Sequence, residues 1–348
     1  MARIQGVRRK KVVVEVNSEA CKSLALLIKS QQIPIDSEDT YLAGFSPAQV
    51  GNFYLCLVAI CHQTSPQGRP PLEGIVNGDS KRGWDYLSAK LEAAAHSDPM
   101  LLAPSKWSDM TESEIRAIFH DSQYGDRLTD PIDRANLIRD LGRVMVKNNW
   151  KWVEDLYHLS GGRVATGNPN LIELLAKFKA YRDPVKKKSY FFLSIMRNNG
   201  LWRYSDAERL GPPVDYHEMR GHLRLGTVVV NDEALRQKLF VGTPVTAAED
   251  VALRQAVHDA ILVVSSLSGL QNASQLHYLF WNVFRSCCNR DAPHCLGCPS
   301  DCTLPARYVH LAIRSTGERR CPFAEMCATT CVTSHNKYFE HVFETDYY

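Results

Sequence analysis

The sequence predicts an all-α protein that carries a cysteine-rich module at its C-terminal end. Three observations support this prediction. Apolar residues recur at spacings of three and four through the middle of the chain, which is the pattern of helices that bury one face. Only two short segments, 12–16 and 227–230, have the composition of strands. Eight of the eleven cysteines follow residue 286.

Helix starts are marked by capping signals. A Ser, Thr or Asn followed three residues later by Glu or Gln predicts a capping box, and a proline in the first turn supports it. These signals begin helices at Ser46-Pro47, Thr111, Asp130-Pro131, Thr246 and Asn272. We expect the first of these helices to extend to His62 and the fourth to end near Ser268.

Segments rich in proline, glycine and polar residues separate the helices, as expected of linkers. They cover residues 63–71, 161–169 and 201–213. From this pattern we expect three parts: an N-terminal extension (1–40), a helical body with the active-site cleft (41–285) and a cysteine-rich module (286–348).

The composition is that of an ordinary folded protein. Of 348 residues, 45% are hydrophobic and 23% are charged, and the net charge of +3 is compatible with a nucleic-acid partner without requiring one. No apolar run reaches the ~20 residues that a membrane-spanning helix needs. The apolar run that follows the basic residues 8–11 is too short for a signal peptide. We therefore expect a cytoplasmic, monomeric protein without a membrane partner.

A lysine and an aspartate have the properties of a catalytic pair. Lys188 begins an apolar helix, where burial and the positive end of the helix favour the neutral, nucleophilic amine. Asp215 follows a rigid Pro-Pro-Val turn, and a carboxylate held there would stabilise a cationic sugar. The alternative is a solvated lysine run at 186–188 and an aspartate that only caps a helix.

The segment that contains Lys188 and Asp215 resembles the helix-hairpin-helix (HhH-GPD) DNA glycosylases, and within them the archaeal 8-oxoguanine glycosylase (AGOG) branch. The resemblance covers patches between residues 70 and 285, and it implies a two-subdomain helical fold. It also implies that Lys188 forms a Schiff base with the sugar and that Asp215 is the essential carboxylate. Trp84, in a Gly-Trp-Asp-Tyr segment, and Trp281 match tryptophans that stack on the base in that branch. Core packing is the alternative role for each tryptophan.

The residues expected to bind the base differ from those of the AGOG branch. His277 stands where an acidic base-reading residue is expected, and Ile195 replaces a second lysine. The glycine-rich turn of most family members is replaced by residues 182–185. These differences argue against 8-oxoguanine as the substrate. A bulky modified base of phage DNA, excised in antiviral defence, is one candidate.

The C-terminal cysteines have the spacing of metal ligands. In a reducing cytosol, such a density predicts metal binding rather than disulfides. The first set resembles the [4Fe–4S] loop of endonuclease III-type glycosylases, except that three residues rather than five precede the fourth cysteine. It consists of Cys288, Cys295, Cys298 and Cys302. The second set predicts a zinc site or supplies an alternative cluster ligand. It consists of Cys321, Cys327, Cys331 and His335.

The sequence therefore predicts a DNA glycosylase that flips a base out of double-stranded DNA and excises it, with or without strand cleavage by the lysine. Two alternatives stay open. Residues 181–183, 214–216 and 347–348 resemble queuosine-salvage nucleotide hydrolases, which lack the cysteine module. The third interpretation is a non-catalytic iron–sulfur or zinc protein that binds nucleic acid.

Overall fold

The structure is a computed structural model. It describes residues 14–30, 42–66, 68–290, 292–298, 302–313, 317–327 and 341–348. These residues are mainly helical, which confirms the predicted fold class at that level. No helix in these ranges has the length and apolar character needed to cross a membrane. Cys331, His335 and the basic residues 8–11 lie outside the described residues.

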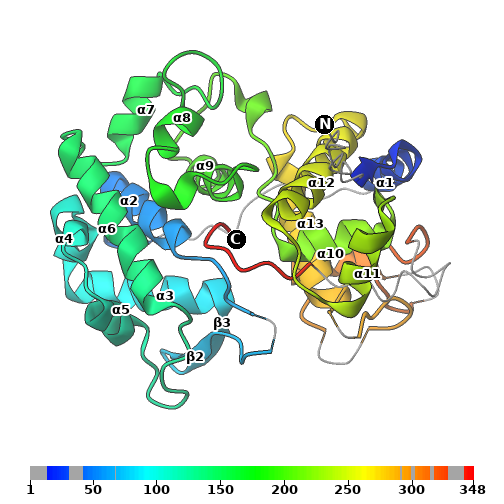
Figure 1. Ribbon diagram of the computed structural model, residues 1–348, viewed down its shortest axis with the longest axis horizontal. Coiled ribbons are helices and arrows are strands. Elements are labelled where there is room, and N and C mark those ends of the chain that lie inside the picture. Colours follow the sequence, from blue (N-terminus) through cyan, green and yellow to red (C-terminus); the bar gives the residue numbers. More distant parts are fainter. Residues whose placement is uncertain are drawn as a thin grey trace, which may run out of the picture. The chain divides into compact units, whose positions relative to one another are not determined.

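The chain divides into two compact units, each assembled from segments that are distant in the sequence. Unit 1 comprises Met1–Gln32, Tyr216–Ser268 and Phe280–Phe343. Unit 2 comprises Ile33–Asp215, Gly269–Leu279 and Glu344–Tyr348. The last five residues therefore belong to a different unit from the segment that precedes them. Figure 1 labels most helices of both units and the strands β2 and β3 of unit 2.

Unit 2 is built around α2 (Pro47–Ala59), in which every residue from Val50 to Ala59 is buried. This helix contacts α6 and α9, and the three share one hydrophobic core. The other helices of the unit are α3 (Gly83–Ser97), α4 (Pro104–Ser108), α5 (Glu112–Phe119), α6 (Pro131–Lys147), α7 (Glu154–Ser160), α8 (Leu171–Leu175) and α9 (Lys187–Asn198). Because α2 is buried on all sides, its end is fixed inside the unit.

Four of the five predicted helix starts are confirmed, and the helix predicted at Asn272 begins two residues later, at Ser274. Ser46 and Gln49 form a complete capping box at the start of α2. Thr111 does the same for α5 with Glu114. The first of these helices is shorter than expected, because α2 ends at Ala59 and the next residues bind side chains of other elements instead of continuing the helix.

One strand pair was not predicted from the sequence. Strands β2 (Glu73–Val76) and β3 (Asp79–Arg82) form an antiparallel hairpin. Its turn is Asn77-Gly78, and both residues have positive φ (54° and 86°), as a tight hairpin turn requires. The hairpin leads directly into α3 and so fixes the position of Trp84 in the first turn of that helix.

Unit 1 combines helices with a second two-stranded sheet. Strands β1 (Val14–Val16) and β4 (Val228–Val230) pair antiparallel, which confirms the two strand predictions. The helices are α1 (Ser18–Ser30), α10 (Tyr216–Leu225), α11 (Glu233–Val241), α12 (Ala247–Ser268), α14 (Ala306–Ala312) and the larger part of α13 (Ser274–Cys287).

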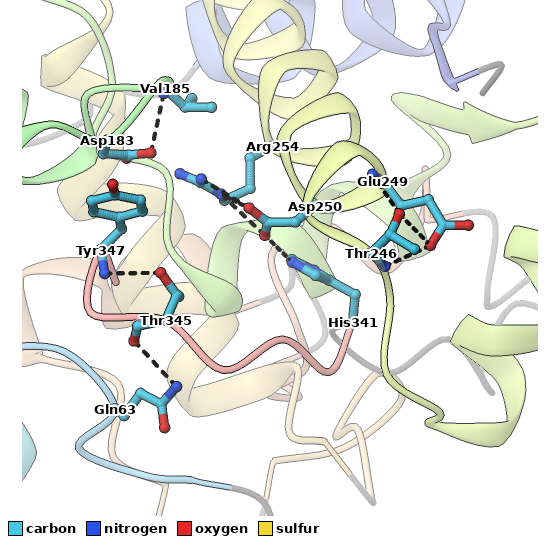
Figure 2. Close-up of polar contacts among 10 residues, drawn as sticks. All are labelled: Gln63, Asp183, Val185, Thr246, Glu249, Asp250, Arg254, His341, Thr345 and Tyr347. Atoms are coloured by element: carbon cyan, nitrogen blue, oxygen red, sulfur yellow. Dashed lines mark hydrogen bonds and ion pairs between the residues drawn. The ribbon is translucent and has the colours of Figure 1, made fainter. Parts of the chain in front are cut away.

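A buried ionic group lies within unit 1. Arg254 and Asp250, both on α12, form an ion pair at 3.0 Å, and the ring Nε2 of His341 lies 2.6 Å from the same carboxylate. Figure 2 shows the three side chains in contact. Burial raises the pKa of Asp250, but the hydrogen bonds and charges of His341 and Arg254 outweigh burial and lower it overall. This group fastens residue 341 to α12.

Candidate functional site

The first turn of α9 presents two buried lysines at fixed positions. The carboxylate of Asp183 accepts hydrogen bonds from the backbone N–H groups of Val185 (3.1 Å) and Lys187 (2.8 Å). The first of these bonds is drawn in Figure 2. Lys186 adopts a left-handed conformation (φ 61°) and its side chain is exposed. Lys187 and Lys188, by contrast, are 7% and 0% exposed, so this run is not a solvated helix end.

Lys188 is held by backbone oxygens. Its Nζ donates a 2.6 Å hydrogen bond to the carbonyl oxygen of Ala59 and another hydrogen bond to that of Asp346. It also lies 3.5 Å from Nδ1 of His62. Burial lowers the pKa of Lys188 to about 7, so a large part of it is neutral near neutral pH.

The last residue of α2 and the four residues after it, which we call the 59–63 segment, make most of these contacts. The guanidinium of Arg134, which is fully buried, donates hydrogen bonds to the carbonyl oxygens of Ile60 and His62. The thiol Sγ of Cys61 lies 3.4 Å from Nζ of Lys187. Burial, together with Arg134 and the two lysines, lowers the pKa of His62 well below its ordinary value, so the ring is neutral. Three cationic side chains thus lie around this segment.

The last residues of the chain, the C-terminal segment (344–348), are part of the same region of unit 2. Gln63 donates hydrogen bonds from its backbone N–H to the carbonyl oxygen of Tyr348 (3.3 Å) and from its side chain to that of Thr345 (3.2 Å). The backbone N–H of Tyr347 bonds the Thr345 hydroxyl at 3.1 Å. Figure 2 shows the contacts of Thr345. Together with the bond to Lys188, they fix the C-terminal segment against the 59–63 segment.

Lys187 belongs to an aromatic group that we call the Phe191 cluster: Trp84, Lys187, Phe191 and His277. The Lys187 Nζ lies 5.0 Å from the centre of the Phe191 ring. That ring makes edge contacts with Trp84 (centres 4.9 Å apart) and with His277 (5.8 Å). The four side chains come from α3, α9 and the part of α13 that belongs to unit 2. Trp84 and Phe191 are only partly buried, so the cluster is accessible from solvent.

Asp215 acts on the same cluster through its charge. The pKa of His277 is lowered to about 4, mainly by burial. The Asp215 carboxylate raises this pKa, and the Lys187 ammonium lowers it further. His277 is therefore neutral near neutral pH, with a carboxylate and an amine as its charged neighbours. Asp215 itself is 8% exposed and follows a tight turn in which the N–H of Val214 bonds the carbonyl oxygen of Pro212 (3.1 Å).

Among the predicted residues of unit 2, the structure thus associates Trp84, His277 and Asp215 with one another. Lys188 directly follows Lys187 of the Phe191 cluster in the sequence, but its Nζ is engaged by the 59–63 and C-terminal segments. Trp281 belongs to unit 1, where its ring lies 4.5 Å from the guanidinium of Arg285.

Sequence reasoning missed two members of the site. Lys187 and Phe191 are four residues apart on one helix, a spacing that places both side chains on the same face. That signal was available, but it could be used only once the phase of α9 was known. The roles of Cys61 and His62 carry no local signal, because they depend on α2 ending at Ala59.

Several C-terminal cysteines of unit 1 interact with one another. The thiols of Cys298 and Cys302 are hydrogen bonded, and the pKa of Cys298 is raised first by burial, then by Cys302 and Cys321. Cys321 also acts on the buried Cys288, whose Sγ accepts a hydrogen bond from Arg224 at 3.3 Å. Cys295 and Cys327 complete the predicted cysteines that the structure describes, and Cys327 bonds the backbone of α10.

The described cysteines form no disulfides with one another. Within the described part of the chain, no three His, Cys, Asp or Glu side chains are arranged closely enough to hold a metal ion. The two metal sites therefore stay predictions.

Comparisons with known proteins assign no family: no protein-family model matches the sequence, and no curated protein is significantly similar to it. The function is accordingly inferred from the site itself.

Proposed function

We propose that the protein is an N-glycosylase that excises a modified base from DNA. One observation carries the proposal. Unit 2 contains a buried lysine pair, the Asp215 carboxylate and the Phe191 cluster. In this cluster the charges of Asp215 and Lys187 both act on His277, and Lys187 lies over the Phe191 ring. An amine, a carboxylate and stacked aromatic rings are the groups that cleavage of a base–sugar bond needs.

Each group has a distinct role in this proposal. The carboxylate of Asp215 stabilises the positive charge that develops on the sugar as the base leaves. A neutral lysine attacks C1′ and gives a covalent intermediate. The faces of Trp84 and Phe191 stack on the extruded base, and the neutral ring of His277 forms hydrogen bonds with its edge. A neutral histidine offers one donor and one acceptor, in place of the acidic base-reading residue of the AGOG branch.

The cysteine module of unit 1 is proposed to bind a structural metal. Electrostatic interactions link four thiols of this module: Cys288, Cys298, Cys302 and Cys321. Thiolate ligands prefer an iron–sulfur cluster or zinc. Sulfur donors of this kind are the ligands of a [4Fe–4S] cluster, with zinc as the alternative. When bound, the metal would stabilise the module, which would contact DNA phosphates through its arginines.

The proposed substrate is double-stranded DNA bound by a monomer. The test is mass spectrometry of the free bases released from DNAs that carry different base modifications. The wild-type protein should release one kind of base and leave abasic sites. Asp215→Asn is the matched variant, because it keeps the size of the side chain and removes the charge, and it should reduce release by at least about 100-fold. Release at the wild-type rate by Asp215→Asn would contradict the assigned role.

A free nucleotide is the second candidate substrate. The C-terminal segment favours this candidate, because it contacts the same residues that surround the lysines. The two tyrosines of that segment are among the features that resemble queuosine-salvage hydrolases. The discriminating experiment incubates the protein with nucleoside monophosphates and, separately, with duplex DNA. Cleavage of a monophosphate without binding of duplex would replace the first candidate with the second.

A further inference from the structure

We infer that Lys187, rather than Lys188, supplies the amine that attacks the sugar, and that Lys188 instead anchors the C-terminal end of the chain. This inference rests on the proposed N-glycosylase function. It assigns the nucleophile to the neighbour of the residue that the sequence favoured.

The hydrogen bonds of Lys188 leave its amine no free face. A neutral amine has two N–H donors and one lone pair. The two donors of Lys188 are used by the carbonyl oxygens of Ala59 and Asp346, and the ring of His62 lies on a third side. The side chain is 0% exposed. To attack a sugar, the amine would have to leave two buried carbonyl groups without their donor, which is costly.

Lys187 is held much less tightly. The contacts of its Nζ are with the thiol of Cys61 at 3.4 Å, a weak hydrogen-bonding group, and with the face of Phe191. Its backbone, in contrast, is fixed by the hydrogen bond to Asp183. The helix start is therefore rigid while the amine remains available, as a nucleophile requires.

The position of Lys187 also matches the position of the proposed substrate. Its Nζ lies over the ring that contacts both Trp84 and His277, the side chains proposed to bind the base. Lys187 and Asp215 both act electrostatically on His277. The charges that act most on Lys188 are those of Cys61 in the 59–63 segment, Lys187, Asp346 in the C-terminal segment, and Arg134.

The reaction balances with these groups. Lys187 Nζ first gives its ammonium proton to water. The nitrogen lone pair then forms a bond to C1′, the C1′–N bond breaks, and the electron pair of that bond leaves on the base, which takes a proton from the solvent. The new secondary ammonium gives a proton to Asp215. The nitrogen lone pair then expels the ring oxygen O4′, which takes the proton held by Asp215, and the C1′=N Schiff base forms. Addition of water to this bond returns the lysine and leaves an abasic sugar.

The test locates the covalent link. Wild-type protein is incubated with a modified duplex that it processes, reduced with borohydride and digested, and the modified lysine is identified by mass spectrometry. We expect the sugar on Lys187. Lys187→Met should lower the yield of trapped complex by at least about 100-fold while duplex binding persists. Lys188→Met should still give an adduct on Lys187, and Lys147→Met, an exposed lysine at the end of α6, is the surface control.

The outcomes separate this inference from the function on which it rests. An adduct on Lys188, or full trapping by Lys187→Met, would overturn the inference and leave the N-glycosylase intact. Base release by a wild-type protein that forms no adduct would also overturn it, because water would then be the nucleophile. No base release from any DNA would remove the proposed function, and the inference with it.

Discussion

Replacement of Lys188 by methionine should make the stability of unit 2 less dependent on pH. The pKa of Lys188 falls from an ordinary value of 10.5 to about 7 on folding. Between these pH values the unfolded chain binds one more proton than the folded protein, so the free energy of unfolding rises with pH. The slope is about 1.4 kcal/mol per pH unit, and the whole window corresponds to about 5 kcal/mol.

The variant lacks this contribution. Relative to wild type, Lys188→Met should therefore gain most stability below pH 7, and the gain should decrease through the window as the pH rises. The variant leaves the carbonyl oxygens of Ala59 and Asp346 without this donor, which costs roughly 1–3 kcal/mol each. That cost shifts the difference between the two proteins, but it does not change the slope.

The assay is urea unfolding at about pH 6, 7, 8 and 9, followed by tryptophan fluorescence. Five of the six tryptophans lie in unit 2, so the signal reports mainly on that unit. The exposed Lys147→Met is the matched control and should show no change of slope. A difference between Lys188→Met and wild type that is constant across this range would refute the conclusion that Lys188 is neutralised by burial.

Three further predictions concern other parts of the chain. Gly142→Ala should destabilise unit 2 by about 1–3 kcal/mol in urea unfolding, because the new Cβ would lie 2.4 Å from a backbone nitrogen of α4; wild-type stability would show that the two helices can separate at little cost. Asp250→Asn should cost about 3 kcal/mol, measured by circular dichroism, because it weakens the ion pair of the fully buried Arg254; a neutral result would mean that this pair contributes no net stability. Cys321→Ser should lower the metal content of the purified protein more than Cys295→Ser does, because Cys321 acts on two other thiols of the set; the opposite order would restore the spacing-based ligand set.

The sequence was most informative where structure is determined locally. The capping boxes at Ser46 and Thr111 involve residues three positions apart, so each helix start could be recognised without knowledge of the rest of the chain. The hairpin at Asn77-Gly78 was equally local, and its turn sequence is a strong hairpin signal that was overlooked.

The candidate site was predictable only in part, because it depends on contacts between distant segments. Asp215 and His277 were identified by resemblance, and the structure adds their electrostatic relation. The choice between Lys187 and Lys188 required the end of α2 and the position of the last five residues, to which Lys188 is bonded. No pattern near residue 188 indicates that the carbonyl oxygen of Asp346 is its partner.

The central claim is that the residues around Asp215 break a base–sugar bond. Its most direct test is the mass spectrum of the small molecules released when the wild-type protein and Asp215→Asn are incubated with a panel of modified DNAs. We predict one free modified base, formed by the wild type in an amount equal to the abasic sites left in the DNA and nearly absent with the variant. Intact DNA with no free base, across the whole panel, would contradict it.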